Sequence, residues 1–221
     1  ETFVDAIIET RRKIPSDTAL YLSGVATPRN AAILIYAGVD LLDEKRAVIN
    51  GSQGIYLTPD DERPIDQLTE LPCECNACDT TLDEFTRTAC IEHNKTVLAA
   101  EVARVRERIK NGTLRDYIEG QARFTQWCTG VFREIDQEWN YIEERTPVAR
   151  RADICATSDD TMRRVEIRRF ADRVTNRYTN RFEHPLVLVP CSARKPYSSS
   201  QSHKQFQDAV QWRGHFVSIS S

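Results

Sequence analysis

The sequence contains no long uninterrupted apolar stretch. The longest candidate, residues 31–42, is broken by Gly38 and Asp40 and falls short of the ~18–20 apolar residues that a membrane-spanning helix needs. The first residues also lack the apolar core of a secretory signal peptide, because Asp5 and Arg11 stand where that core would lie. These absences argue against a transmembrane or secreted protein and predict a cytoplasmic one with no membrane partner.

An excess of positive charge is missing as well. The 221 residues include 30 Lys and Arg against 33 Asp and Glu, for a formal net charge of −3. No global basic field therefore indicates nucleic-acid binding, and any RNA contact must use a local patch or a domain outside this chain. Because the chain starts with Glu1 and ends inside a predicted strand, we expect a fragment of a longer protein.

The seven cysteines do not have the spacing of a disulfide framework. Their number is odd, and three of them, Cys73, Cys75 and Cys78, fall within six residues. In a chain without a signal peptide this pattern indicates reduced thiols and metal binding at the cluster. The rest of the composition, 40% hydrophobic and 29% charged, is that of a globular protein and excludes a wholly disordered chain.

Helices and strands alternate in the first part of the chain. The apolar pattern predicts a helix over residues 2–13, a buried strand over 19–26, a helix over 27–38 and a second buried strand over 39–43. Thr27 and Pro28 suit the start of the second helix, and Gly38 suits its end. This order predicts a βαβ unit with parallel strands. Asn50 and Gly51 then predict a turn before a strand that ends near residue 58.

The rest of the chain is predicted to be helical and then to form a second βαβ unit. Helices are expected over residues 81–90 and 97–109 and continuously over 114–145. The helical pattern fails over residues 146–160, which we interpret as the boundary between one domain, 1–145, and a second, 146–221. The second domain is expected to contain a helix over 165–182, a strand over 186–190, a helix over 198–212 and a strand over 215–220.

The strongest local motif is Cys73-x-Cys75-x-x-Cys78, which His93 follows fifteen residues later. Thiolates at this spacing can converge on one ion, and a Cys₃His set completes a tetrahedral zinc site. Such a site has no open coordination position, so it would contribute folding free energy. Cys90 lies one helical turn from His93 and is the alternative fourth ligand, although we assign it to the helix core. Ordinary thiols beside a helix histidine are the competing interpretation.

Several ordered motifs resemble the C-terminal part of tRNA-guanine transglycosylases. The motifs are YLSGVATPRN (21–30), GVDLLD (38–43), NGSQGIYLT (50–58), CECNAC (73–78) and EHN (92–94). The resemblance covers about residues 15–125. It implies an α/β fold, a partial TIM barrel with a zinc-binding helical insertion, in which residues 19–43 form two late strands and the helix between them.

Asp43 ends the predicted strand over residues 39–43. The family resemblance aligns it with the nucleophilic aspartate of the transglycosylases, and TIM-barrel chemistry takes place at the C-terminal ends of the strands. The following residues, EKRAVINGS, differ from the arginine-rich stretch of the active family members. The alternative interpretation of Asp43 is a solvated loop carboxylate.

A second concentration of reactive groups, PCSARKPYSSSQSH, occupies residues 190–203. Cys191 directly follows a predicted strand, and Lys195 is close enough in sequence to favour its thiolate. Ser198 with Gln201 is expected to cap the next helix, and His203 in its first turn is placed to transfer a proton. Each residue has a structural alternative when taken singly: a core thiol, a solvated lysine or a flexible serine-rich loop.

The same loop resembles the signature of archaeosine synthases, which are paralogues of the archaeal transglycosylases. The matching positions are Pro190, Cys191, Lys195, Pro196, Tyr197, Ser200 and His203, and RRVEIRRFADRVTNRY (163–178) also resembles that family. The resemblance implies action on 7-cyano-7-deazaguanine in archaeal tRNA, where the nitrile becomes an amidine. Glutamine, lysine or ammonia would supply the nitrogen, and a homo-oligomer or a partner enzyme is compatible with this activity.

The residues of the loop suit nitrile chemistry. A thiolate at Cys191 can add to the electrophilic nitrile carbon, and an amine can then displace the sulfur from the thioimidate. His203 would protonate the imide nitrogen, while Lys195 would stabilise negative charge or hold a carboxylate. Ser200 belongs to the same candidate catalytic set.

Arginines are concentrated between Arg145 and His184. This segment has ten arginines and no lysine against six acidic residues. Arginine pairs at 150/151, 163/164 and 168/169 could bind RNA phosphates bidentately. The alternative is a solvated helix face whose charge is balanced by the neighbouring acidic residues.

Three hypotheses therefore stand for the function. The first is an amidine-forming transferase acting on tRNA through residues 190–203, and the second is a transglycosylase that exchanges a base through Asp43. The third is a non-catalytic tRNA-binding or partner subunit. The thiol at Cys191 favours the first hypothesis, because base exchange needs no thiol.

Overall fold

A computed structural model describes residues 2–150, 152–179, 183–193, 196–211 and 213–219. The chain divides into two compact units, one extending through Phe170 and the other beginning at Ala171. Among the described residues no helix is long and apolar enough to cross a membrane. The protein is a mixed α/β structure, and each unit is considered separately below.

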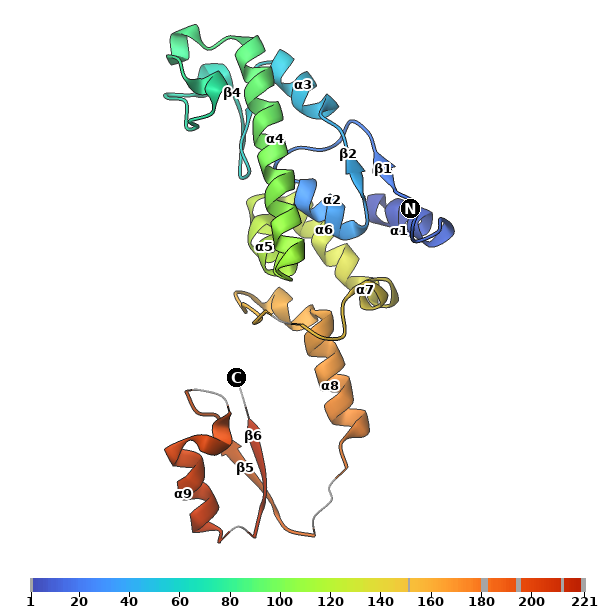
Figure 1. Ribbon diagram of the computed structural model, residues 1–221, viewed down its shortest axis with the longest axis vertical. Helices are drawn as coiled ribbons and strands as arrows, with labels where there is room; N and C mark the ends of the chain where they lie inside the picture. The colour runs from blue at the N-terminus through green and yellow to red at the C-terminus, as the bar shows by residue number, and fades with distance from the viewer. Residues whose placement is uncertain (1, 151, 180–182, 194–195, 212, 220–221) are drawn as a thin grey trace. The chain divides into compact units, whose positions relative to one another are not determined.

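The first unit contains most of the helices (Figure 1). Its helices are α1 (Phe3–Lys13), α2 (Ala31–Ala37), α3 (Lys45–Ser52), α4 (Arg87–Lys110), α5 (Leu114–Gln121), α6 (Gln126–Gln137) and α7 (Trp139–Arg145), and α8 (Val165–Arg177) begins in it. Its strands are β1 (Tyr21–Leu22), β2 (Leu41–Leu42), β3 (Ile55–Leu57) and β4 (Glu62–Pro64). Strand β1 pairs in parallel with β2, and β3 pairs with β4 in the antiparallel sense.

The parallel pair β1–β2 with α2 between its strands confirms the predicted first βαβ unit. Gly38 ends α2 with a φ of 114°, a left-handed conformation that glycine adopts without steric cost. The helix starts later than expected because Thr27 forms a turn with Asn30, whose side chain accepts a hydrogen bond from the Thr27 N–H at 2.8 Å. The predicted helix over 27–38 therefore becomes a capping turn followed by α2.

The predicted turn at Asn50 and Gly51 is wrong, because both residues lie inside helix α3. Helix α3 packs along α4, and the absence of a side chain at Gly51 allows the backbone of Ile91 to approach (Figure 1). The chain turns instead at Gly54, which has a φ of 76°. Tertiary packing thus overrides the local turn preference of Asn-Gly.

Helices α4 to α7 differ from the helices expected from the apolar pattern, since α4 joins the end of the helix expected over 81–90 with the one expected over 97–109. Helix α4 begins only at Arg87, where the Thr86 side chain accepts a hydrogen bond from Ala89 N–H. The expected single helix over 114–145 is divided into α5, α6 and α7. One break falls at Thr125, whose side chain caps α6, because Ser and Thr side chains that bind free N–H groups favour a helix start.

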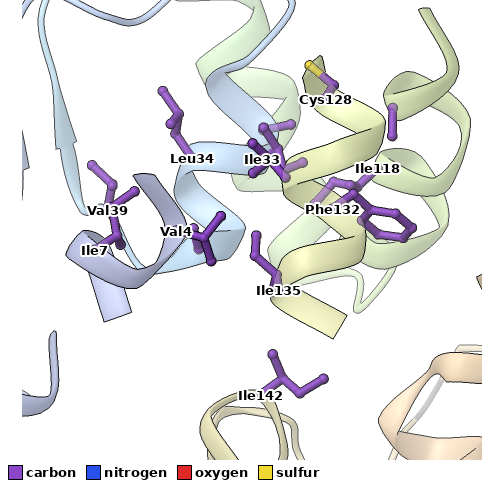
Figure 2. Packing of buried hydrophobic residues seen from close by; sticks show 14 of the residues in the cluster. Val4, Ile7, Ile33, Leu34, Val39, Ile118, Cys128, Phe132, Ile135 and Ile142 are labelled. Carbon is purple, nitrogen blue, oxygen red and sulfur yellow. The ribbon is translucent and has the colours of Figure 1, made fainter. Parts of the chain in front are cut away.

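The core of the first unit lies among α1, α2, α5 and α6 (Figure 2). Helices α1 and α6 contribute apolar side chains at helical spacing, whereas the short helix α2 is buried on several sides. The labelled members are Val4, Ile7, Ile33, Leu34, Val39, Ile118, Cys128, Phe132, Ile135 and Ile142. This core fixes the helices that flank β1 and β2, and so it supports the residues at the ends of those strands.

The second unit confirms the other predicted βαβ arrangement. Strands β5 (Leu186–Pro190) and β6 (His215–Ile219) pair in parallel, with helix α9 (Gln201–Ala209) between them in sequence (Figure 1). Ser200, and not Ser198, caps α9, since its hydroxyl accepts a hydrogen bond from the His203 N–H. Ser198 lies instead in a short 3-10 helix, Tyr197–Ser199.

Candidate functional site

Cys73, Cys75, Cys78 and His93 come together beside strand β3. Their four candidate ligand atoms all lie within 4.8 Å of one another. Cys75 precedes and Cys78 ends a short 3-10 helix, Asn76–Cys78, while His93 projects from α4. The tight turn of the 3-10 helix and the docking of α4 on β3 thus produce a group that could hold a metal ion.

The spacing of three of these atoms fits tetrahedral coordination of one ion. The Sγ atoms of Cys75 and Cys78 are 3.6 Å apart, and His93 Nδ1 lies 3.5 Å from the first and 3.3 Å from the second. Ligands at ordinary zinc–sulfur and zinc–nitrogen distances in a tetrahedron would be roughly 3.5–3.8 Å apart. The residues present therefore suit a small metal ion with sulfur and nitrogen ligands.

Neighbouring groups fix the orientation of His93. Its Nε2 lies 2.9 Å from the carbonyl oxygen of Leu57, which can only accept a hydrogen bond, so Nε2 carries the proton and Nδ1 faces the thiols. Tyr56 stacks on the ring with centroids 3.8 Å apart, and its hydroxyl contacts Cys78 Sγ at 3.5 Å. Burial lowers the pKa of His93 and favours the neutral ring that a metal requires.

Cys90 lies outside this group. Its side chain is fully buried, and its thiol donates to the carbonyl oxygen of Ile55 at 3.4 Å. Burial raises the pKa of Cys90 to about 11, so the uncharged thiol is the favoured form. Its position agrees with a place in the helix core.

Asp43 lies where the parallel strands β1 and β2 end. Its Oδ2 accepts hydrogen bonds from the hydroxyls of Tyr21 at 2.5 Å and Ser23 at 2.8 Å. Its Oδ1 accepts from the N–H groups of Gly24 at 2.9 Å and Lys45 at 3.2 Å. The hydrogen bond from Tyr21, followed by those from Gly24 and Ser23, holds the pKa of this carboxyl well below its usual range. The carboxylate is therefore ionised and held in one orientation.

Two of the predicted catalytic residues, Cys191 in the loop after β5 and His203 in α9, differ in their exposure to solvent. Cys191 is exposed directly after the last residue of β5. His203 is only 4% exposed, in the first turn of α9. Lys195 lies outside the described residues. The structure thus leaves the thiol open to an approaching substrate and encloses the imidazole.

Two serine hydroxyls hold the ring of His203. Nδ1 lies 2.9 Å from Ser200 Oγ, and Nε2 lies 2.9 Å from the Oγ of Ser218 in β6. Tyr197 stacks near the ring with centroids 5.8 Å apart, and Phe206 meets its edge. Ser218 was not predicted from the sequence, since it is distant from the loop in the chain and belongs to no local motif.

The described arginines of the predicted pairs divide between the interior and the surface, and Arg151 lies outside the described residues. Arg150, Arg164 and Arg169 are largely buried and form ion pairs within the first unit. Arg163 and Arg168 are exposed, and Arg168 also lies over the ring of Trp139. The partners of the three inward arginines include Asp116, Glu143 and Glu166. Only part of the predicted patch is therefore available to RNA.

Comparison with protein families identifies two regions of the chain. Residues 1–126 match the family described as queuine tRNA-ribosyltransferase. Residues 167–221 match a family described as a domain of unknown function (DUF5591). The first match contains Asp43 and the four candidate metal ligands, and the second contains the loop after β5.

The chain is similar to several curated proteins. It is 57% identical to archaeosine synthase from Haloferax volcanii over 99% of this chain and 37% of that protein. It is 42% identical to archaeosine synthase subunit alpha from Methanosarcina acetivorans over 92% of this chain and 34% of that protein. A tRNA-guanine(15) transglycosylase from Pyrococcus abyssi is 25% identical over 92% of this chain and 37% of that protein.

These alignments span about a third of the length of the relatives. The match to the family model covers more than half of this chain. It includes strands β1 and β2 and the Cys₃His group. The chain therefore belongs to the queuine tRNA-ribosyltransferase family.

Proposed function

We propose that the protein containing this chain modifies tRNA by converting the nitrile of a 7-cyano-7-deazaguanine base into an amidine. The observation that carries this proposal is the 57% identity to an archaeosine synthase across 99% of the chain. The identity to a transglycosylase is 25%, so the amidine-forming relatives are the better guide to the chemistry. We infer an archaeal protein on the same grounds.

The reaction would begin at Cys191, the exposed thiol after β5. Its sulfur adds to the nitrile carbon, and the nitrogen takes up a proton to give a thioimidate. An amine then adds to the same carbon, the carbon–sulfur bond breaks, and an amidine and a free thiol remain. Covalent catalysis of this kind divides one slow step into two faster ones.

The other predicted residues of the loop would assist this sequence. His203 would supply the proton to the nitrogen, and Ser200 would orient the imidazole through its hydrogen bond to Nδ1. Lys195 would stabilise negative charge or hold a carboxylate of the amine donor, which would be glutamine, lysine or ammonia. Asp43 would have no chemical step in this reaction.

We further propose that the Cys₃His group holds a structural zinc ion. Four protein ligands leave no open coordination position, and their sulfur and nitrogen atoms are the ligands that zinc prefers. Zinc at this position would hold the cysteine-bearing loop against helix α4 and contribute folding free energy. It would take no part in the chemistry at Cys191.

The scaffold suits a partial TIM barrel over residues 1–145, with the zinc-binding segment as a helical insertion. The parallel pair β1–β2, with its connecting helix and with Asp43 at the strand ends, is the arrangement that such a barrel repeats. Residues 146–221 would form a second, smaller α/β domain. The exposed arginines Arg163 and Arg168 would bind tRNA phosphates. A homo-oligomer or a partner enzyme would be compatible with this assembly.

Mass spectrometry of modified tRNA tests the proposal. The complete protein is mixed with tRNA that carries the cyano base and with each amine donor in turn, and the digested nucleosides are measured. We expect an amidine nucleoside or its amino-acid adduct with the wild-type protein and none with Cys191→Ala, while the metal content of the variant stays unchanged. Full activity of Cys191→Ala would remove the covalent step.

Base exchange is the second candidate, favoured by the position of Asp43 at the ends of β1 and β2. Release of free base from tRNA, abolished in Asp43→Ala, would support it and contradict the amidine proposal. Binding of tRNA without any change in its nucleosides would support the third hypothesis, a non-catalytic subunit.

A further inference from the structure

The burial of His203 limits its direct access to a substrate. Only 4% of the residue is exposed, and serine hydroxyls lie 2.9 Å from both ring nitrogens. A proton that leaves Nε2 would therefore transfer to Ser218 Oγ before it reaches any group outside the protein. Ser218 itself is half-buried, and so it is closer to solvent than the ring.

The hydrogen bonds around Ser200 can hold His203 in the form of a general base. Ser200 Oγ accepts from the backbone N–H of His203 at 3.2 Å and lies 3.2 Å from Ser202 Oγ. If Ser200 donates its proton to Ser202, its second lone pair can accept Nδ1–H. Nε2 then accepts a hydrogen bond from the hydroxyl of Ser218. A base oriented by a third group and bonded to a hydroxyl is the recurring arrangement of proton-transfer sites.

The strand register places Ser218 near the C-terminal end of β5, which the candidate nucleophile Cys191 directly follows. Ser218 pairs with Val189 in the parallel sheet, and Ile219 pairs with Pro190, the residue before Cys191. Because β5 and β6 run in the same direction, the serine and the cysteine lie toward the same edge of the sheet. Ser218, whose hydroxyl contacts the buried base, and Cys191, which directly follows the last residue of β5, thus lie at the same end of the two strands.

We propose that Ser218 is a further catalytic residue, whose hydroxyl relays protons between buried His203 and the reacting thiol and nitrile. This inference rests on the amidine-forming function proposed above. The Cys191 thiol gives its proton to Ser218 Oγ while the proton of Ser218 passes to Nε2 of His203. Sulfur then bonds to the nitrile carbon, and one carbon–nitrogen π bond becomes a lone pair on nitrogen. That nitrogen takes a proton from Ser218, which recovers one from Nε2, so Ser218 and His203 return to their starting protonation while the thiol proton is now on the thioimidate nitrogen.

A matched pair of variants isolates the hydroxyl. Ser218→Thr and Ser218→Val have the same shape and suit a strand equally, but only threonine keeps a hydroxyl. In the complete protein, with the cyano-modified tRNA and an amine donor, we expect Ser218→Thr to keep most of the rate of amidine formation. We expect Ser218→Val and Ser218→Ala to lose roughly 100-fold, the lower end of the range for acid–base groups. Ser198→Ala, at an exposed serine of the same segment, should keep the full rate.

A double-mutant cycle distinguishes a relay from mere support of the fold. If Ser218 acts through His203, the double variant Ser218→Ala/His203→Ala should be no slower than His203→Ala alone. Any feature of the pH–rate profile that disappears in His203→Ala should also disappear in Ser218→Ala. Rate losses that multiply in the double variant, or full activity of both Ser218→Ala and Ser218→Val, would overturn the relay. A wild-type protein that forms no amidine would overturn the proposed function and the relay with it.

Discussion

His93 and His203 are both buried, and the groups that meet their ring nitrogens differ in a way that suits different tasks. Nε2 of His93 contacts the carbonyl oxygen of Leu57, an acceptor that permits one tautomer only. The nitrogens of His203 contact serine hydroxyls, which can both donate and accept protons. A fixed tautomer suits a metal ligand, whereas hydroxyl partners suit a group that gains and loses a proton.

The candidate metal site can be tested by substituting single cysteines. Cys78→Ser should abolish stoichiometric metal binding, since Cys78 Sγ lies 3.3 Å from His93 Nδ1 within the ligand group. Cys90→Ser is the matched control: it changes a buried thiol outside the group and should leave the metal content unchanged. Elemental analysis of the purified proteins measures the difference. Metal retained at full occupancy in Cys78→Ser would contradict the assignment.

The lowered pKa of Asp43 predicts that the folded protein loses stability as the pH becomes acidic. Because hydrogen bonds lower its pKa in the folded protein, the stabilisation is present above the unfolded value near ~4 and is lost as the pH falls below it. Asp43→Asn should lower the free energy of unfolding at pH 7 by about 1 kcal/mol, a modest value because the carboxylate borders solvent. Urea unfolding between pH 3 and 7 should show a smaller acid destabilisation in the variant. Equal pH dependence in the two proteins would contradict this account.

At the scale of elements, the close packing of α3 on α4 decides the local conformation around Gly51. A Cβ atom added at Gly51 would lie 2.6 Å from the Cα atom of Ile91, far inside contact distance. Glycine is ordinarily the weaker helix former, so its presence inside α3 is explained by the neighbouring helix and not by propensity. Helix α4 also carries His93, and hence this contact supports the metal site.

Two glycine substitutions should change stability in opposite directions. Gly51→Ala should lower the free energy of unfolding by roughly 1–3 kcal/mol, because backbone must move to admit the methyl group. Gly120→Ala in α5 meets no atom within 4 Å and should raise it by about 0.5–1 kcal/mol through helix propensity. Chemical denaturation of both variants checks the signs. A stabilising Gly51→Ala would show that α3 and α4 are less closely packed.

At the scale of the molecule, the two family matches contain different candidate functional residues. The transglycosylase-family part holds the Cys₃His group and Asp43, whereas the loop after β5 carries the thiol and the imidazole. The candidate metal site lies wholly within the first compact unit. Metal binding should accordingly stabilise that unit directly.

Chelation tests this division. Removing the metal should lower the unfolding temperature of the first unit by roughly 10 °C or more, given the large folding contribution of structural metal sites. The transition of the second unit should stay unchanged, which calorimetry with and without chelator would measure. Equal shifts of both transitions would indicate that the units unfold together and would contradict the prediction.

Local pattern predicted the elements whose stability comes from nearby residues. Helix α1, which begins with a capping box of Thr2 and Asp5, and the two parallel βαβ units agree with the apolar spacing of their residues. The metal group was visible because three of its ligands lie within six residues and the fourth is on the helix that follows. Features that depend on residues close together in the chain can therefore be predicted from the sequence.

Sequence alone determined the family motifs, predicted the parallel strand pairs and indicated Cys191, Asp43 and the four candidate metal ligands as candidate functional residues. Tertiary structure decided that Asn50 and Gly51 are helical, and that His203 is enclosed between Ser200 and Ser218. The reason is physical: packing energies and hydrogen bonds between residues distant in the chain depend on which surfaces meet after folding. Neither the hydrophobic periodicity nor the motif spacing of the sequence predicts which of these residues come into contact.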